Sequence, residues 1–72
     1  MLTNNDVQVL STLENKLYYT IMDNLFENGI TVAKAEYEKF ISKLESEGYT
    51  DWVINSIVNK NKQVINLLKG GN

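Results

Sequence analysis

Apolar side chains recur at intervals of three and four along the first third of the chain, a spacing that places them on one face of an α-helix. The positions are Val7, Leu10, Leu13, Leu17, Ile21 and Leu25. Because Asp6 suits the positive end of a helix and Gly29 supplies a stop, the pattern predicts one helix over residues 3–28. In its second half the apolar arc widens, so more than one surface must cover it. The added residues are Tyr18, Tyr19, Met22 and Phe26.

A second apolar stripe follows Gly29 and predicts a helix over residues 32–47. Its members are Ala33, Tyr37, Phe40, Ile41 and Leu44. We expect Thr31 to cap the N-terminus of this helix and Gly48 to end it. The stripe has the width of a surface helix with one buried face.

A third stripe begins after Gly48, where Thr50 is placed to cap a helix and Asp51 falls in the first turn. Its members are Val53, Ile54, Ile57, Val58, Val64, Ile65 and Leu68. Trp52 lies off this stripe, so it either packs at the helix end or anchors a partner. Two short glycine-centred turns imply antiparallel neighbours. The sequence therefore predicts an all-α fold, with a long N-terminal helix and two shorter antiparallel helices in a single domain over residues 1–72.

Asn61 falls in the middle of the third apolar stripe. In one interpretation the helix ends or bends there, and residues 60–72 form a separate basic amphipathic tail. In the other, Asn61 is buried and fixes the pairing of the helices at some cost in stability. We favour the exposed interpretation because lysines, Lys60 and Lys62, stand on both sides.

The predicted helix lengths leave part of the first helix uncovered. At about 1.5 Å per residue, the second helix folds back from Gly29 only as far as about Leu13. Earlier apolar residues then lack cover, which is typical of a self-association surface. A chain of 72 residues without cysteine or histidine also lacks disulfide or zinc stabilisation. We therefore expect a helical homodimer. Its predicted interface residues are Val7, Leu10, Leu13, Leu17 and Tyr18.

Composition argues against several classes of function. Without histidine or cysteine, general acid–base catalysis near neutral pH and activated nucleophiles are not expected, so we predict a non-enzymatic protein with no cofactor and no metal site. A net charge of −2 without arginine gives no attraction to nucleic acid or anionic lipid, although the second and third helices form a hairpin like a helix-turn-helix. No apolar run could cross a membrane. We expect a protein of the bacterial cytoplasm.

The C-terminal segment combines lysines with apolar residues and contains no carboxylate. Its predicted partner-binding residues are Lys60, Lys62, Val64, Ile65, Leu68 and Lys69. The apolar side chains would dock in a groove of a partner while the lysines meet carboxylates. This organisation resembles internal scaffolding proteins of tailed phages, above all the small capsid-morphogenesis scaffolds of staphylococcal pathogenicity islands.

The resemblance implies a dimer whose C-terminal tails bind the phage major capsid (coat) protein, transiently inside procapsids, and thereby direct capsid assembly or size. Many weak contacts acting together suit such a scaffold. The alternative is a small regulator or inhibitor, encoded by a phage or plasmid, that binds one host or repressor protein. Co-assembly with shells distinguishes the scaffold from the inhibitor.

Overall fold

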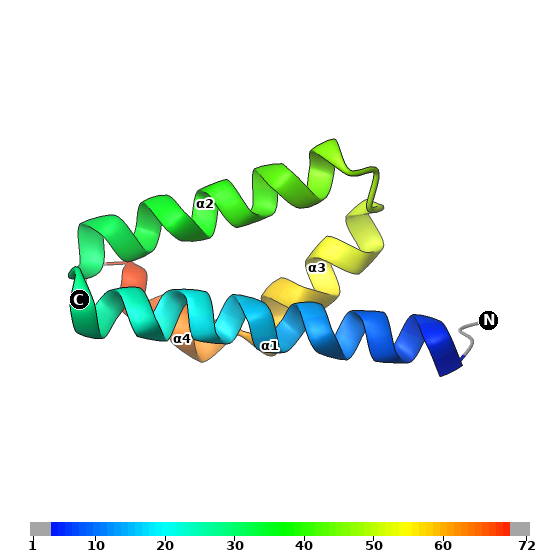
Figure 1. The fold of residues 1–72 in the computed structure, drawn as a ribbon, viewed down its shortest axis with the longest axis horizontal. Coiled ribbons are helices and arrows are strands. Elements are labelled where there is room, and N and C mark those ends of the chain that lie inside the picture. The colour runs from blue at the N-terminus through cyan, green and yellow to red at the C-terminus, as the bar shows by residue number, and fades with distance from the viewer. Residues whose placement is uncertain (1–3, 70–72) are drawn as a thin grey trace.

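The computed structural model describes residues 4–69, which form four helices (Figure 1). In chain order these are α1 (Asn4–Glu27), α2 (Ile30–Ser46), α3 (Asp51–Lys60) and α4 (Lys62–Leu68). α1 and α2 form an antiparallel hairpin, and α3 and α4 run back along this hairpin toward the α1–α2 turn. The predicted all-α fold is confirmed, but the expected third helix is divided in two. No helix within residues 4–69 is both long and apolar enough to span a bilayer.

Gly29 makes the turn between α1 and α2. Its φ of 90° and ψ of 174° fall in a region of backbone space that is open essentially to glycine alone. The Asn24 carbonyl accepts hydrogen bonds from the backbone N–H groups of Asn28 and Gly29, at 2.7 and 2.9 Å. α2 then starts at Ile30 with Gly29 as its N-cap residue. The prediction that Thr31 caps this helix is wrong, because the glycine completes the turn two residues earlier.

Replacing Gly29 by alanine is expected to lower the free energy of unfolding by about 1–3 kcal/mol, the usual cost of holding a non-glycine residue in such a conformation. The loss would come from the backbone alone, since an added Cβ meets no atom within 4 Å. Urea unfolding measures it. D-alanine at the same position, introduced by chemical synthesis, adopts positive φ readily and should leave stability close to that of the parent. An equal loss with both enantiomers would contradict a backbone origin.

Gly48 ends the second helix as predicted. It too has a φ of 90°, and the backbone N–H of Tyr49 donates to the Leu44 carbonyl at 3.1 Å, one of the bonds of a Schellman motif. Thr50 then caps α3, because its hydroxyl oxygen accepts a bond from the backbone N–H of Val53 at 3.4 Å. The capping role predicted for Thr50 is therefore confirmed.

The core collects side chains from all four helices. Leu17, Ile21 and Ile57 are the largest side chains that are fully buried. The other buried apolar residues are Ala33, Leu44, Ile54, Ile65 and Leu68. Every one of these residues belongs to a predicted apolar stripe, so periodicity identified the core faces correctly. α3 and α4 supply half of the buried apolar residues, which makes the C-terminal segment part of the fold.

Asn61 separates α3 from α4 and is itself buried, with only 3% of its surface exposed. Its side-chain Nδ2 donates to the Ile57 carbonyl at 3.0 Å and to the Glu14 carbonyl at 3.1 Å. Its backbone N–H bonds to Val58 instead of continuing the α-helical pattern to Ile57. The predicted break in the helix is confirmed, but the exposed interpretation of Asn61 is wrong. The side chain ties the break to the middle of α1.

Candidate protein-binding surface

The five residues predicted to form a dimer interface are divided between core and surface. Leu17 is 0% exposed and lies in the core of its own chain, so its assignment to an interface is wrong. Leu10 and Leu13 are half-buried against that core. Val7 and Tyr18 are exposed. The reason is that α3 and α4 cover a face of α1 that the sequence analysis left for a second copy.

The predicted partner-binding residues are divided in the same way. Ile65 and Leu68 are buried in the core cluster and Val64 is partly buried beside it, so these side chains do not form an exposed docking face. Their assignment as partner anchors is corrected: the break at Asn61 turns α4 onto the hairpin. The predicted lysines are all exposed. They are Lys60, Lys62 and Lys69.

Leu67 is an exposed apolar residue that the sequence analysis missed. Half of its surface is accessible, on the same short helix as Lys62. It lies outside the periodic stripe of apolar residues. A leucine outside that stripe, in a segment that carries lysines, is the feature of the sequence that could have identified it as an exposed apolar residue. No aspartate or glutamate follows Asp51 in the sequence, so α4 carries basic but no acidic side chains.

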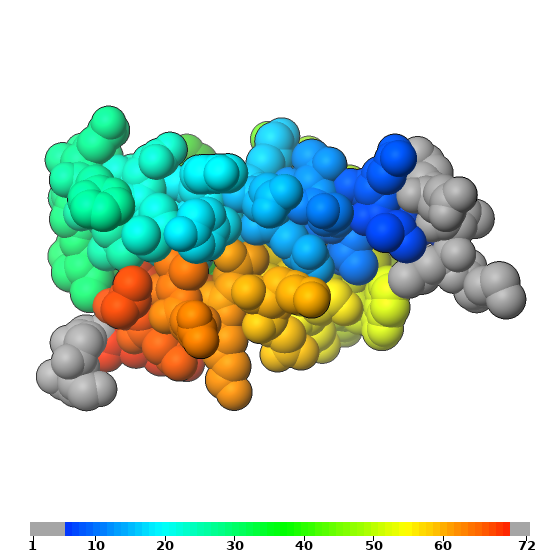
Figure 2. All heavy atoms as spheres, turned by 90° about the horizontal axis from the view of Figure 1, so that it is seen from below, coloured from blue at the N-terminus to red at the C-terminus, as the bar shows by residue number. Residues whose placement is uncertain are grey.

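The second half of α1 exposes large aromatic side chains. Phe26 is 83% exposed and Tyr19 is 60% exposed, while Tyr18 packs edge-on against Tyr19 with ring centroids 5.4 Å apart. Tyr19, Met22 and Phe26 follow one another at helical spacing, and we call them the outer stripe of α1. Figure 2 shows a long face of the molecule on which α1 lies beside α3 and α4. Exposed aromatic groups of this kind on a small domain mark interaction sites.

A hollow of about 350 Å³ lies at the opposite end of α1. Its lining residues are Asp6, Val9, Leu10, Gly48, Tyr49, Thr50, Trp52 and Val53. Trp52 lines this hollow at the start of α3 with more than half of its surface exposed, an arrangement that fits both helix-end packing and a partner anchor. The size suits one or two side chains of a partner.

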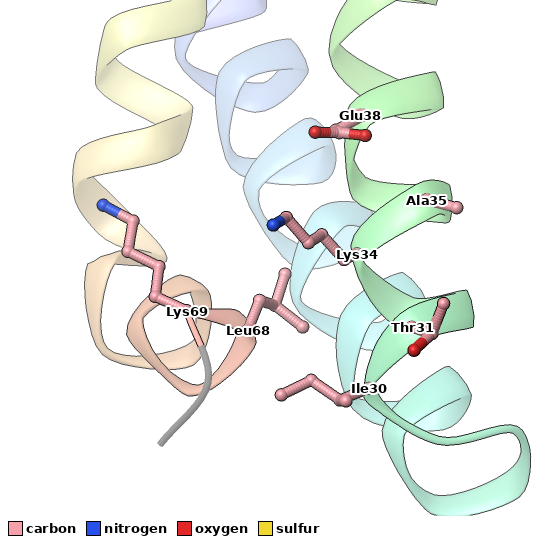
Figure 3. A pocket seen from close by; sticks show the side chains of 7 residues that line it. All are labelled: Ile30, Thr31, Lys34, Ala35, Glu38, Leu68 and Lys69. Atoms are coloured by element: carbon pink, nitrogen blue, oxygen red, sulfur yellow. The ribbon is translucent and has the colours of Figure 1, made fainter. Parts of the chain in front are cut away.

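A wider hollow of about 720 Å³ lies between the start of α2 and the end of α4 (Figure 3). Ile30 and Leu68 extend toward each other across it, and Lys34 and Glu38 reach from α2 toward α4. Lys69 completes the lining from the C-terminal side. The lining mixes two lysines with one glutamate over an apolar floor, which gives no single charge preference.

Tyr37 is a titratable group whose surroundings perturb it. Burial raises the pKa of Tyr37, and the nearby Glu38 carboxylate raises it further. The phenol therefore stays neutral at physiological pH and acts as a partly buried packing group. Within residues 4–69, no three acidic side chains come together in a way that could hold a metal ion.

Comparison of the chain with protein-family models, with curated proteins and with solved structures gives no match.

Proposed function

We propose that this chain is a non-enzymatic protein-binding module that acts as an internal scaffold, dimerising and binding a phage coat protein to direct capsid assembly or size. The observation that carries the proposal is the number of large apolar side chains left exposed on so small a domain. They are Val7, Val9, Tyr18, Tyr19, Phe26, Ile30, Val32, Trp52 and Leu67. Single exposed apolar residues are ordinary, but a group of aromatic ones needs a partner to cover it.

The scaffold is favoured by the charge of the C-terminal quarter. Lys60, Lys62 and Lys69 are exposed on a segment without carboxylates, and Leu67 is exposed on the same segment. A basic rim with one apolar contact suits an acidic patch on another protein, and it binds weakly enough to be released. The coat-protein contact is therefore assigned to these four side chains, in place of Ile65 and the buried face of α4.

The alternative is an inhibitor that forms a discrete complex with one host or repressor protein. The hollow beside Trp52 favours it, because a largely apolar hollow with an exposed tryptophan at its side suits one anchored partner. A scaffold and an inhibitor differ in stoichiometry. Light scattering of the complex separates them, since a scaffold enters shells in many copies.

Charge reversal at Lys60 and Lys62 (Lys60→Glu with Lys62→Glu) is expected to slow association with coat protein by about tenfold at low salt, because rim charges mainly steer encounter. The assay mixes the purified chain with coat protein of a tailed phage that infects the native host, and follows association rate and shell diameter. Lys34→Glu with Lys39→Glu makes the same change in net charge on exposed positions of α2 and should have a much smaller effect.

Two outcomes would contradict the scaffold. One is a shell diameter and a co-sedimenting fraction that the chain does not change. The other is equal slowing by both pairs of substitutions, which would reduce the effect to net charge. Deletion of residues 62–72 is not a suitable test, because it removes the buried side chains of Ile65 and Leu68 from the core.

A further inference from the structure

The outer stripe of α1 is apolar, with Tyr19 and Phe26 exposed and Met22 partly buried between them. We propose that a second copy of this chain docks on it, with the two α1 helices antiparallel and a two-fold axis passing near Met22. This inference rests on the dimer of the proposed function and gives that dimer its interface. It moves the interface from the N-terminal half of α1, where the sequence analysis expected it, to the C-terminal half.

Helical geometry brings the exposed rings together in this arrangement. Tyr19 and Phe26 are seven residues apart, about two turns, so they share one side of α1 with Met22 between them. A two-fold axis near Met22 sets Tyr19 of each copy against Phe26 of the other. The pair therefore forms two aromatic contacts, each between side chains that are mostly exposed in the single chain.

The area available is sufficient for a dimer. At roughly 150–250 Å² per aromatic side chain, the exposed parts of Tyr18, Tyr19 and Phe26 amount to about 300–450 Å² per copy. Two copies would bury twice this area from the rings alone. The rings alone thus approach the roughly 1,000 Å² that a specific interface needs, and Met22 and the polar neighbours of the stripe lie beside them.

The charges beside the stripe favour the antiparallel arrangement. Lys16 and Glu27 are eleven residues apart, about three turns, so both lie on the same flank of the stripe. Both side chains are exposed. The two-fold axis sets Lys16 of each copy opposite Glu27 of the other, which gives two attractive pairs. In a parallel two-fold pair this flank of one copy lies on the opposite side of the contact from the same flank of the other, so Lys16 and Glu27 would not pair across it.

Asp23 lies on the same flank and close to the proposed axis. Its two copies would approach each other, which is unfavourable at neutral pH. The arrangement therefore makes an unusual prediction: Asp23→Asn should tighten the dimer, although it removes charge from an exposed position. A surface that did not meet its own copy near residue 22 would not respond in this way.

Sedimentation equilibrium of the purified chain alone, between about 1 and 100 µM, tests the proposal. The parent chain should dimerise in this range. Phe26→Ser should raise the dimer dissociation constant by about tenfold or more. Lys16→Glu and Glu27→Lys should each weaken the dimer, and the double variant should restore it. Far-UV circular dichroism of each variant should retain the parent helix content, because the replaced side chains are exposed.

Val7→Ser is the matched control, since it replaces an exposed apolar residue in the other half of α1. It should leave the dissociation constant unchanged. A monomer throughout the concentration range, weakening by Val7→Ser with none by Phe26→Ser, or no recovery in the double charge variant would overturn the proposal. No coat protein is present in this experiment, so its outcome is independent of whether the chain acts as a scaffold.

Discussion

Replacing Leu17 by alanine is expected to lower the free energy of unfolding by about 3–5 kcal/mol, because the side chain is fully buried and leaves a cavity that its neighbours only partly fill. That is a large share of the roughly 4–11 kcal/mol that a domain of this size has in total. Urea unfolding at a fixed protein concentration measures the loss. If the alanine variant is too unstable to show a folded baseline, Ile21→Val at a neighbouring buried position should lose about 0.5–1.5 kcal/mol.

Val7→Ala provides the comparison on the same helix. Val7 is exposed, and its truncation should change the free energy of unfolding by less than about 0.5 kcal/mol. If Leu17→Ala instead left monomer stability unchanged and altered only self-association, Leu17 would belong to an interface between copies, as the apolar stripe alone suggested.

Asn61→Asp is expected to cost about 2–4 kcal/mol at neutral pH, although the two side chains have nearly the same shape. The amide donates to the Glu14 and Ile57 carbonyls, whereas an ionised carboxylate has no proton to donate and faces two carbonyl oxygens. Chemical unfolding at pH 7 measures the cost. Asn59→Asp places the same charge at an exposed position two residues earlier and should have little effect.

The cost at Asn61 should depend on pH in a defined direction. Burial and the two carbonyl oxygens would raise the folded-state pKa of the introduced carboxyl above its unfolded value of about 3.9. The variant should therefore keep most of its stability below that pH and lose it as pH rises toward the folded-state pKa. A loss independent of pH would contradict this explanation and indicate that packing alone is disturbed.

Much of this fold could be predicted because it depends on local patterns. The positions of Gly29 and Gly48 set the ends of α1 and α2, and the periodic apolar residues identified each buried face. The burial of Asn61 was harder to predict. Neighbours on a helix point about 100° apart, so Lys60 and Lys62 extend to either side while Asn61 faces inward. Flanking lysines were therefore weak evidence of exposure.

The candidate binding surface could be predicted only in part. The wide apolar arc of α1 correctly indicated that one neighbour would not cover all of it. Which residues stay uncovered depends on the direction of α4, which follows the break at Asn61 and its long-range bond to Glu14 and lets Ile65 and Leu68 enter the core. Ile65 was assigned to a partner and Leu17 to a dimer for this reason, and Phe26 was not singled out.

The bond between Asn61 and Glu14 also has a consequence for synthesis on the ribosome. Its two residues are 47 positions apart, and α4 follows the second of them. The α1–α2 hairpin forms from neighbouring segments, but the face of α1 that α3 and α4 bury cannot be covered before the ribosome has added residue 61. At about 5–20 residues per second, the ribosome needs seconds to add the residues between Ile21 and Asn61. During that interval the nascent chain exposes Leu17 and Ile21 as well as its surface aromatic residues. The apolar surface open to chaperones is therefore larger at this stage than in the folded chain.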